Sequence, residues 1–198
     1  MRMWDHKVPG IPDDLFIKSD RIPGPTKEEI RVLTISKTRL HKGSYVIDIG
    51  CGIGSLTVEA ALQVAPMGKV FSIDKEKESI RLTKENAKRF GVEDIVTCVH
   101  GKAPEAMYDL PIVDSVIIGG GLSQDVIKTS AKKLKVNGCI VINSILLETS
   151  YTAIVELKKL NFKELEVIQA FIAKGREVGR KTMMIARNPI TIISAKKS

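Results

Sequence analysis

The feature that most constrains the fold of this chain is a glycine-rich turn that directly follows an apolar run. The run Val46-Ile47-Asp48-Ile49 leads into Gly50-Cys51-Gly52-Ile53-Gly54, after which the residues favour a helix. A buried strand that ends in such a turn leaves free N–H groups at the helix N-terminus, and glycine lets a ligand approach the main chain. A second apolar run ends at Asp74, where a carboxylate can accept hydrogen bonds from ribose hydroxyls. Together they predict a site for an adenosine-containing ligand.

The length and composition suit one globular unit. The 198 residues are 43% apolar, enough for one core, and we expect a single domain, residues 1–198, with an N-terminal arm at 1–25. The longest apolar stretch, Cys139 to Leu147, is interrupted by Asn143 and Ser144, so no membrane span is expected. Met1 to Asp20 is mixed and charged, unlike a signal peptide, which predicts a cytoplasmic protein.

The cysteines and histidines predict neither disulfides nor a metal site. Cys51, Cys98 and Cys139 are odd in number and fall in strands or in the glycine turn, so reduced thiols are expected. No histidine has a partner at metal-ligand spacing, so we expect no metal site.

Strand-like and helix-like segments alternate, as in a parallel α/β sheet. A helix is expected over Thr26 to Leu40, opened by Thr26 with Glu29 three residues later, the spacing of a capping box. The next expected strands are 45–50, 69–74, 95–101, 113–119 and 138–145, and the expected helices are 56–64, 75–90, 123–134 and 147–160.

The end of the chain departs from this alternation. Residues 163–173 and 182–195 are both apolar and β-branched, and the basic connection between them is too short for a parallel crossover of about a dozen residues. An antiparallel hairpin after five parallel strands is typical of the seven-stranded sheet of class I methyltransferases. Pro189 cannot donate to a sheet, so we expect the last strand to break there, with 190–194 on an edge or in a subunit contact.

The glycine turn favours S-adenosylmethionine over two alternatives. Its glycines are spaced differently from the G-x-G-x-x-G pattern of dehydrogenases, and Asp48 is the acid that methyltransferases use to orient this loop. An NAD-binding domain and a plain α/β turn with a surface Asp74 are the alternatives. The turn Gly101-Lys102-Ala103 is expected to meet adenine through its backbone, because the Lys102 side chain cannot accept a hydrogen bond. Gly119, Gly120 and Gly121 end the fourth strand, where they either leave room for a bulky acceptor or form a flexible loop.

Beyond the glycine turn, the chain resembles one methyltransferase family over nearly its whole length. The similar segments are 10–16 (GIPDDLF), 23–31 (PGPTKEEIR), 48–54 (DIGCGIG), 103–106 (APEA), 145–149 (ILLET) and the GR…TMM…RNP residues between 175 and 189. These segments resemble the decarboxylating cobalt-precorrin methyltransferases that act at carbon 15 in anaerobic cobalamin biosynthesis.

This resemblance implies a site, an assembly and two reactions. The residues implied to contact S-adenosylmethionine, together with Asp48, are Thr26, Gly50, Cys51, Gly52, Ile53, Gly54, Asp74, Gly101, Lys102 and Ala103. The family also implies a homotetramer, methylation of a ring carbon and loss of carbon dioxide from an acetate arm. No catalytic acid or base is evident, and the cobalt would arrive within the substrate.

The charge of +8 fits an anionic corrinoid partner. We expect Arg176, Arg180 and Lys181 to pair with its carboxylates, since guanidinium binds carboxylate bidentately. An S-adenosylmethionine-dependent RNA (tRNA) methyltransferase is the alternative enzyme. The 5% aromatic content and the lack of an appended RNA-binding domain disfavour nucleic acid as a partner. A non-catalytic scaffold that keeps cofactor binding is a third possibility.

Overall fold

The computed structural model describes residues 4, 6 and 8–198, so part of the expected arm 1–25 (residues 1–3, 5 and 7) lies outside the described residues. The α-helices are α1 (Glu28–Thr38), α2 (Ser55–Val64), α3 (Lys77–Arg89), α4 (Gln124–Lys133) and α5 (Leu147–Lys159). The strands are β1 (Tyr45–Ile49), β2 (Lys69–Asp74), β3 (Val96–His100), β4 (Val113–Ile118), β5 (Leu134–Ser144), β6 (Lys163–Ala170), β7 (Ala173–Val178), β8 (Lys181–Ala186) and β9 (Ile190–Lys196). Two short 3-10 helices, η1 (Asp13–Leu15) and η2 (Glu105–Met107), lie in loops.

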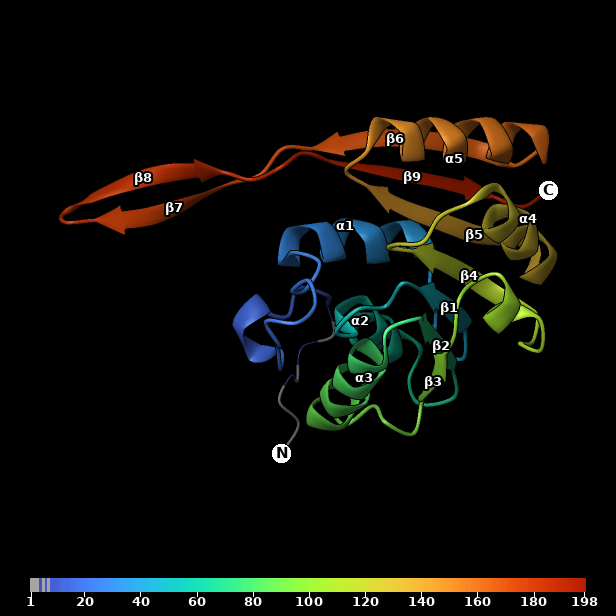
Figure 1. Cartoon of the computed structure of the whole chain (residues 1–198), viewed down its shortest axis with the longest axis horizontal. Helices are drawn as coiled ribbons and strands as arrows, with labels where there is room; N and C mark the ends of the chain where they lie inside the picture. The colour runs from blue at the N-terminus through green and yellow to red at the C-terminus, as the bar shows by residue number, and fades with distance from the viewer. Residues whose placement is uncertain (1–3, 5, 7) are drawn as a thin grey trace.

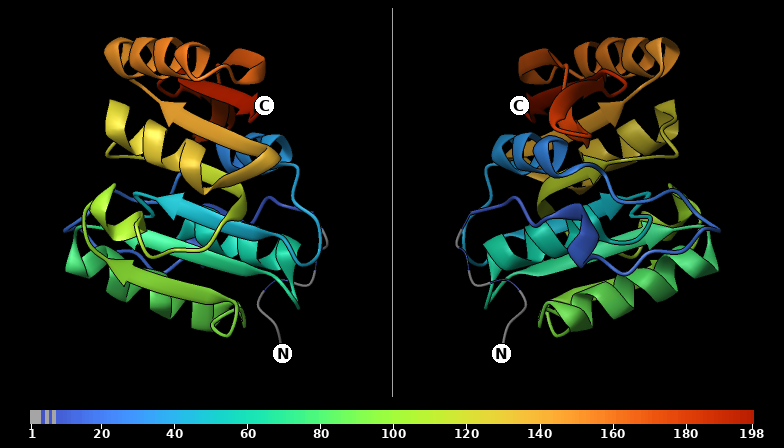
Figure 2. Two further views of the ribbon diagram at one scale, coloured as in Figure 1. Left: turned by 90° about the vertical axis from the view of Figure 1, so that its right-hand side faces the viewer. Right: turned by 90° about the vertical axis from the view of Figure 1, so that its left-hand side faces the viewer.

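Seven strands form one mixed sheet in the order β3-β2-β1-β4-β5-β9-β6. The first five strands are parallel to their neighbours, whereas β9 runs antiparallel to both β5 and β6. Helices α1 to α3 cover one face of the sheet, and α4 and α5 cover the other (Figures 1 and 2). The order reverses between β1 and β4, so the carboxyl ends of these strands flank the crevice where open α/β sheets bind ligands.

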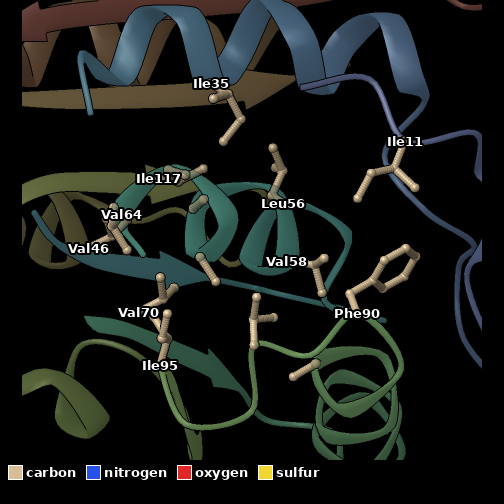
Figure 3. Close-up of a cluster of buried hydrophobic side chains, with 14 of the residues drawn as sticks. Ile11, Ile35, Val46, Leu56, Val58, Val64, Val70, Phe90, Ile95 and Ile117 are labelled. Atoms are coloured by element: carbon tan, nitrogen blue, oxygen red, sulfur yellow. The ribbon is translucent and has the colours of Figure 1, made fainter. Parts of the chain in front are cut away.

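Each face of the sheet has its own apolar core. Figure 3 shows the core under α1 to α3, where Val46 and Val70 of the sheet meet Leu56 of α2 and Phe90 after α3. The opposite core packs α4 and α5 against β1, β4, β5 and β9. Among residues 4, 6 and 8–198, no helix has the length and apolar character required to cross a bilayer.

The C-terminal hairpin is confirmed, but it is longer and more divided than predicted. The expected strand 163–173 is split into β6 and β7, and 182–195 is split into β8 and β9, with Pro189 in the second break. β6 and β9 remain in the main sheet, while β7 and β8 form a separate two-stranded ribbon that extends far from the body (Figure 1). The expectation that 190–194 lies at a sheet edge was wrong, because β9 is inserted between β5 and β6 and buries Ile192 and Ile193.

The start of α1 also differs from the prediction. The N-cap position is Lys27, which makes no side-chain cap, and Thr26 lies before the helix. Asp13, from η1, takes the capping role by accepting a hydrogen bond from the Glu28 N–H at 3.0 Å. The predicted partner Glu29 forms ion pairs with Lys174 and Arg187 instead.

A buried ionic network fixes the N-terminal arm to the helices. Arg31 of α1 is fully buried and pairs with Glu59 of α2 at 3.2 Å and with Asp13 at 2.7 Å. Its guanidinium also donates to the carbonyl oxygens of Ile11 and Thr26. Arg31 therefore joins α1 to α2 through Glu59 and holds the chain at Ile11 and Asp13 on one side and at Thr26 on the other.

Candidate functional site

The glycine turn connects β1 to α2. Glycine is required at its three positions for different structural reasons. Gly50, Gly52 and Gly54 all have positive φ, at 71°, 56° and 81°. A Cβ atom on Gly50 would lie 2.8 Å from the Gly120 nitrogen, and one on Gly54 would lie 2.8 to 2.9 Å from Thr83. A Cβ on Gly52 would meet no atom within 4 Å. Two of the glycines therefore permit close packing inside the protein, and Gly52 leaves its surface open to a ligand.

Asp74, at the end of β2, is bound to this turn. Its Oδ2 accepts a hydrogen bond from the Gly52 N–H and its Oδ1 accepts one from the Glu76 N–H, both at 2.9 Å. A carboxylate has about four lone-pair positions, so both oxygens retain the capacity to accept from a ligand. The two hydrogen bonds from the backbone fix the orientation of the Asp74 carboxylate, and therefore the direction from which a ligand can donate to it.

Asp48 of β1 lies buried beneath the turn and is only partly hydrogen-bonded. Its Oδ2 accepts from the Thr57 hydroxyl at 2.6 Å, and Thr57 in turn accepts from Ser72 at 3.0 Å. Its Oδ1 is buried and has no hydrogen-bond partner among the described residues. Burial raises the pKa of Asp48 from 3.8 to about 6, opposed by the Thr57 hydrogen bond and assisted by the negative charge of Asp74. Such an oxygen is an acceptor prepared for a donor outside the protein chain.

A cavity of about 430 Å³, here called the glycine-turn cavity, opens at this edge of the sheet. It is lined by Ile22, Pro23, Gly24, Thr26, Ile49, Gly50, Cys51, Gly52, Ile53, Ser55, Ile73, Asp74, Lys75, Glu76, Ser79, Gly101, Lys102, Ala103, Gly119, Gly120 and Gly121. Of the residues predicted to contact the cofactor, only Asp48 and Gly54 are not in this lining. The lining also includes Ile22, Pro23 and Gly24 of the arm, for which the sequence analysis predicted no contact.

The three glycines after β4 belong to this same cavity, and their main chain has a structural role. Gly119 donates from its N–H to the Ile49 carbonyl at 2.9 Å, and Gly120 lies against Gly50. The segment is therefore held against the glycine turn, which excludes the interpretation of Gly119 and Gly120 as a freely flexible loop.

A second cavity of about 650 Å³, here called the Arg187 cavity, adjoins the first. It is lined by Pro23, Gly24, Pro25, Thr26, Lys27, Ile30, Gly119, Asn143, Ser144, Ile145, Ile172, Arg187, Asn188 and Ile190. The two cavities share Pro23, Gly24, Thr26 and Gly119. The two cavities therefore lie side by side at the arm and the end of β4.

The three cations predicted to bind substrate lie elsewhere. Arg176 is in β7, Lys181 begins β8 and Arg180 is at the tip between them, and all three are exposed. None of them lines either cavity, because the ribbon that carries them extends away from the body (Figure 1). The predicted role of these cations in binding substrate carboxylates therefore stays a prediction.

Neither the cysteines nor the metal-ligating side chains of the described residues indicate a further reactive centre. All three cysteines are free, as predicted, and burial raises the pKa of the Cys51 thiol well above its ordinary range, which disfavours a nucleophilic thiolate. Among the residues that the structure describes, no group of three or more His, Cys, Asp or Glu side chains is arranged to hold a metal ion.

Comparisons with known proteins identify the family. A family model described as a precorrin methyltransferase domain matches residues 15–197. A probable cobalt-precorrin-6B C(15)-methyltransferase (decarboxylating) of Saccharolobus solfataricus is 45% identical over 197 residues, covering 98% of each chain. The crystal structure of precorrin-8w decarboxylase from Methanobacterium thermoautotrophicum has a TM-score of 0.88 at 38% identity and covers 93% of this chain and 98% of that one.

A more distant likeness supports the fold class alone. A SAM-dependent O-methyltransferase of Thermotoga maritima superposes with a TM-score of 0.77 at 20% identity, covering 90% of this chain and 68% of that chain. The sheet order and this likeness confirm the predicted class I methyltransferase fold. With the match over residues 15–197 and 45% identity across the whole length, the chain belongs to the precorrin methyltransferase family.

Proposed function

We propose that this protein is an S-adenosylmethionine-dependent methyltransferase that methylates carbon 15 of a cobalt-precorrin and removes the ring C acetate carboxyl as carbon dioxide, in cobalamin biosynthesis. The observation that carries the proposal is the family match over residues 15–197, combined with an intact glycine-turn cavity inside that span. The RNA methyltransferase alternative loses its support, since the curated relatives act on precorrins by name and span the whole chain.

The glycine-turn cavity is the proposed donor site, and its residues fit the donor. Its volume of about 430 Å³ lies within the range of roughly 300 to 1,000 Å³ usual for small-molecule sites. Asp48 lies outside the lining, beneath the turn, and its buried negative charge would favour the ammonium of the methionine moiety electrostatically. Asp74 would accept from the ribose hydroxyls, and the open face of Gly52 gives the donor access to the main chain.

The remaining donor contacts are assigned by position in the same lining. Thr26 would close the cavity from the arm, and the turn at Gly101 to Ala103 would border the adenine. That turn is held in place by the Gly101 N–H, which donates to the Asp74 carbonyl at 3.0 Å. Gly50, Cys51 and Ile53 of the glycine turn also line the cavity, and Gly54 is proposed as a contact on the resemblance alone.

For methyl transfer, the main task of this chain is alignment. The donor supplies a sulfonium methyl that is already activated. Well-oriented reactants reach effective molarities of about 10⁵ to 10⁸ M, worth roughly 7 to 11 kcal/mol. The residues shared by the two cavities, such as Thr26 and Gly119, would border the place where the reacting groups meet. The electron-rich ring carbon is the nucleophile, so no activated side chain is required.

Decarboxylation places a different demand on the protein. The bond between the acetate methylene and its carboxyl group breaks, the electron pair passes into the conjugated ring, and a proton is taken up on carbon. Because the macrocycle accepts the electrons, the protein contributes by binding the substrate and by positioning the departing carboxylate over the ring.

One experiment tests both reactions. The protein is incubated with isotopically labelled S-adenosylmethionine and a cobalt-precorrin mixture, and the products are analysed by mass spectrometry. We expect a product that is heavier by one methyl and lighter by carbon dioxide. Calorimetry with S-adenosylhomocysteine should show strong binding, lost in Asp74→Ala and retained in the control Asp94→Ala, which removes an exposed carboxylate outside the cavity. Equal binding by the two variants would contradict the donor site.

We further propose the homotetramer that the resemblance implies, with the β7–β8 ribbon as its contact. Val178, Met183 and Met184 are 53%, 49% and 62% exposed. Neighbouring residues on a strand point to opposite faces, so Met183 and Met184 leave both faces of the ribbon apolar. A lone two-stranded ribbon is marginally stable in water, and packing between copies would stabilise it. Light scattering should show a tetramer in the wild type and smaller species in Met183→Lys/Met184→Lys; a monomeric wild type would contradict this assembly.

A further inference from the structure

We propose that the Arg187 cavity is the acceptor site and that Arg187 is the anchor for a peripheral carboxylate of the corrinoid. The inference rests on the proposed function and goes beyond it by assigning a cavity to the acceptor and a role to Arg187, a residue of the RNP segment for which the resemblance implied no contact. It also replaces Arg176, Arg180 and Lys181 as the cations expected to contact the substrate beside the donor.

The position of the cavity is the first reason. It shares four lining residues with the glycine-turn cavity, Pro23, Gly24, Thr26 and Gly119, so the two spaces meet along one border. Methyl transfer needs the donor methyl and the acceptor carbon in direct contact, with no protein atom between them. Its volume of about 650 Å³ also exceeds that of the glycine-turn cavity, as an acceptor larger than the donor requires.

The charge of the lining is the second reason. Among the described residues that line the Arg187 cavity, Lys27 and Arg187 are cationic and no side chain is acidic. A corrinoid precursor carries acetate and propionate carboxylates around its rim, which such a lining attracts. Arginine is suited to this task because its planar guanidinium can hold a carboxylate through two parallel hydrogen bonds.

The placement of Arg187 is the third reason. Its Nη1 donates to Glu29 Oε2 at 3.1 Å, and this is the one side-chain hydrogen bond that Arg187 makes to the residues described. Its backbone N–H donates to the Ile172 carbonyl at 2.9 Å, which fixes the chain where the ribbon leaves the sheet. Four of the five guanidinium N–H groups therefore remain available, on a side chain that is 30% exposed.

The apolar walls complete the fit to a macrocycle. Ile30, Ile145, Ile172 and Ile190 line the same cavity. Ile145 is 65% exposed and is followed by the exposed Leu146 and Leu147, so the apolar surface continues beyond the rim. A flat ring with an apolar centre and an acidic edge would place its face on these side chains and its edge on Arg187.

The test measures the binding of a corrinoid and of the donor product separately. Cobyrinic acid, which bears free carboxylates, and cobinamide, in which they are amides, are titrated by calorimetry into the full-length protein with S-adenosylhomocysteine present. The variants are Arg187→Ala, Arg187→Lys and the matched control Arg89→Ala, an exposed arginine of α3 that lines neither cavity. S-Adenosylhomocysteine affinity and thermal unfolding are measured for each protein.

We expect the wild type to bind cobyrinic acid more tightly than cobinamide. Arg187→Ala should lose about 10- to 100-fold in cobyrinic acid affinity, the range for an ion-paired hydrogen bond, with cobinamide and S-adenosylhomocysteine affinities unchanged. Arg187→Lys should retain part of the affinity, and Arg89→Ala all of it.

Three results would overturn the proposal: equal affinity of Arg187→Ala and wild type for cobyrinic acid, no preference of the wild type for cobyrinic acid over cobinamide, or no corrinoid binding at all. A loss in Arg176→Ala with none in Arg187→Ala would assign the anchor to the ribbon instead. Failure of the wild type to bind S-adenosylhomocysteine would count against the donor site alone, so the two proposals fail separately.

Discussion

Asp48 should make the protein less stable in the absence of ligand, and Asp48→Asn tests this directly. The carboxylate is buried, one of its oxygens lacks a partner among the described residues, and its pKa is raised from 3.8 to about 6. One pKa unit corresponds to about 1.4 kcal/mol, so ionised Asp48 costs the folded state about 3 kcal/mol at neutral pH. Asparagine removes the charge and keeps an oxygen that can accept from Thr57.

The sign of the pH dependence follows from the protons bound in each state. Between pH 3.8 and about 6, the unfolded chain has lost the Asp48 proton and the folded chain retains it. The contribution of this group to the free energy of unfolding therefore falls as pH rises, and the loss is complete above the folded pKa. Carboxyls such as Asp13 and Asp114, whose pKa is lowered in the folded protein, have the opposite dependence.

The measurement is urea unfolding followed by circular dichroism, from pH 4 to pH 8, for the wild type and Asp48→Asn without ligand. Asp13 and Asp114 are present in both proteins, so their contributions cancel in the difference. The stability of the variant relative to the wild type should rise by about 2 to 2.5 kcal/mol between pH 4 and pH 7, since the unfolded chain has already lost about half of its Asp48 proton at pH 4. The same variant should lose S-adenosylhomocysteine affinity. A difference that stays constant with pH would refute the argument that Asp48 is ionised at a cost.

Two further predictions concern the scaffold around the site. Gly50→Ala and Gly52→Ala both force alanine to positive φ, at a cost of about 1 to 2 kcal/mol, but only Gly50→Ala also places a Cβ 2.8 Å from Gly120. Thermal unfolding should therefore show the larger loss for Gly50→Ala, and equal losses would contradict the packing argument. Arg31→Met should destabilise the protein by about 3 to 5 kcal/mol in urea, because Glu59 is left as a buried unpaired charge, and adding Glu59→Gln should recover part of the loss. No recovery in the double variant would show that packing, not charge, dominates there.

The sheet and the glycine turn could be predicted because their signals are local. Each parallel strand is an apolar run with a turn at its end, and the acids at Asp48 and Asp74 occur at fixed places relative to those turns. The family, too, could be recognised from short segments that stay in order along the chain, and the comparisons confirm it.

What could not be predicted depends on residues far apart in the sequence. The cap of α1 comes from Asp13, which lies 15 residues before its partner and has no spacing rule. Alternation of side chains is the same in a strand of the main sheet and in a free ribbon, so the sequence of 163–195 did not reveal where β7 and β8 leave the body. Arg187 was missed for the same reason, since it approaches the arm and Asn143 only after β9 inserts beside β5.

The burial of Arg31 has a consequence for how a ligand gains access to the glycine-turn cavity. The wall formed by Ile22 to Gly24 lies between two anchored points, since Arg31 holds Ile11 and Asp13 on one side and Thr26 on the other. Displacing either anchored point would break contacts of the fully buried Arg31 guanidinium, at about 3 to 5 kcal/mol. Both ends of the wall are thus pinned to the helices, which confines any opening of the cavity on this side to the segment between Asp13 and Thr26.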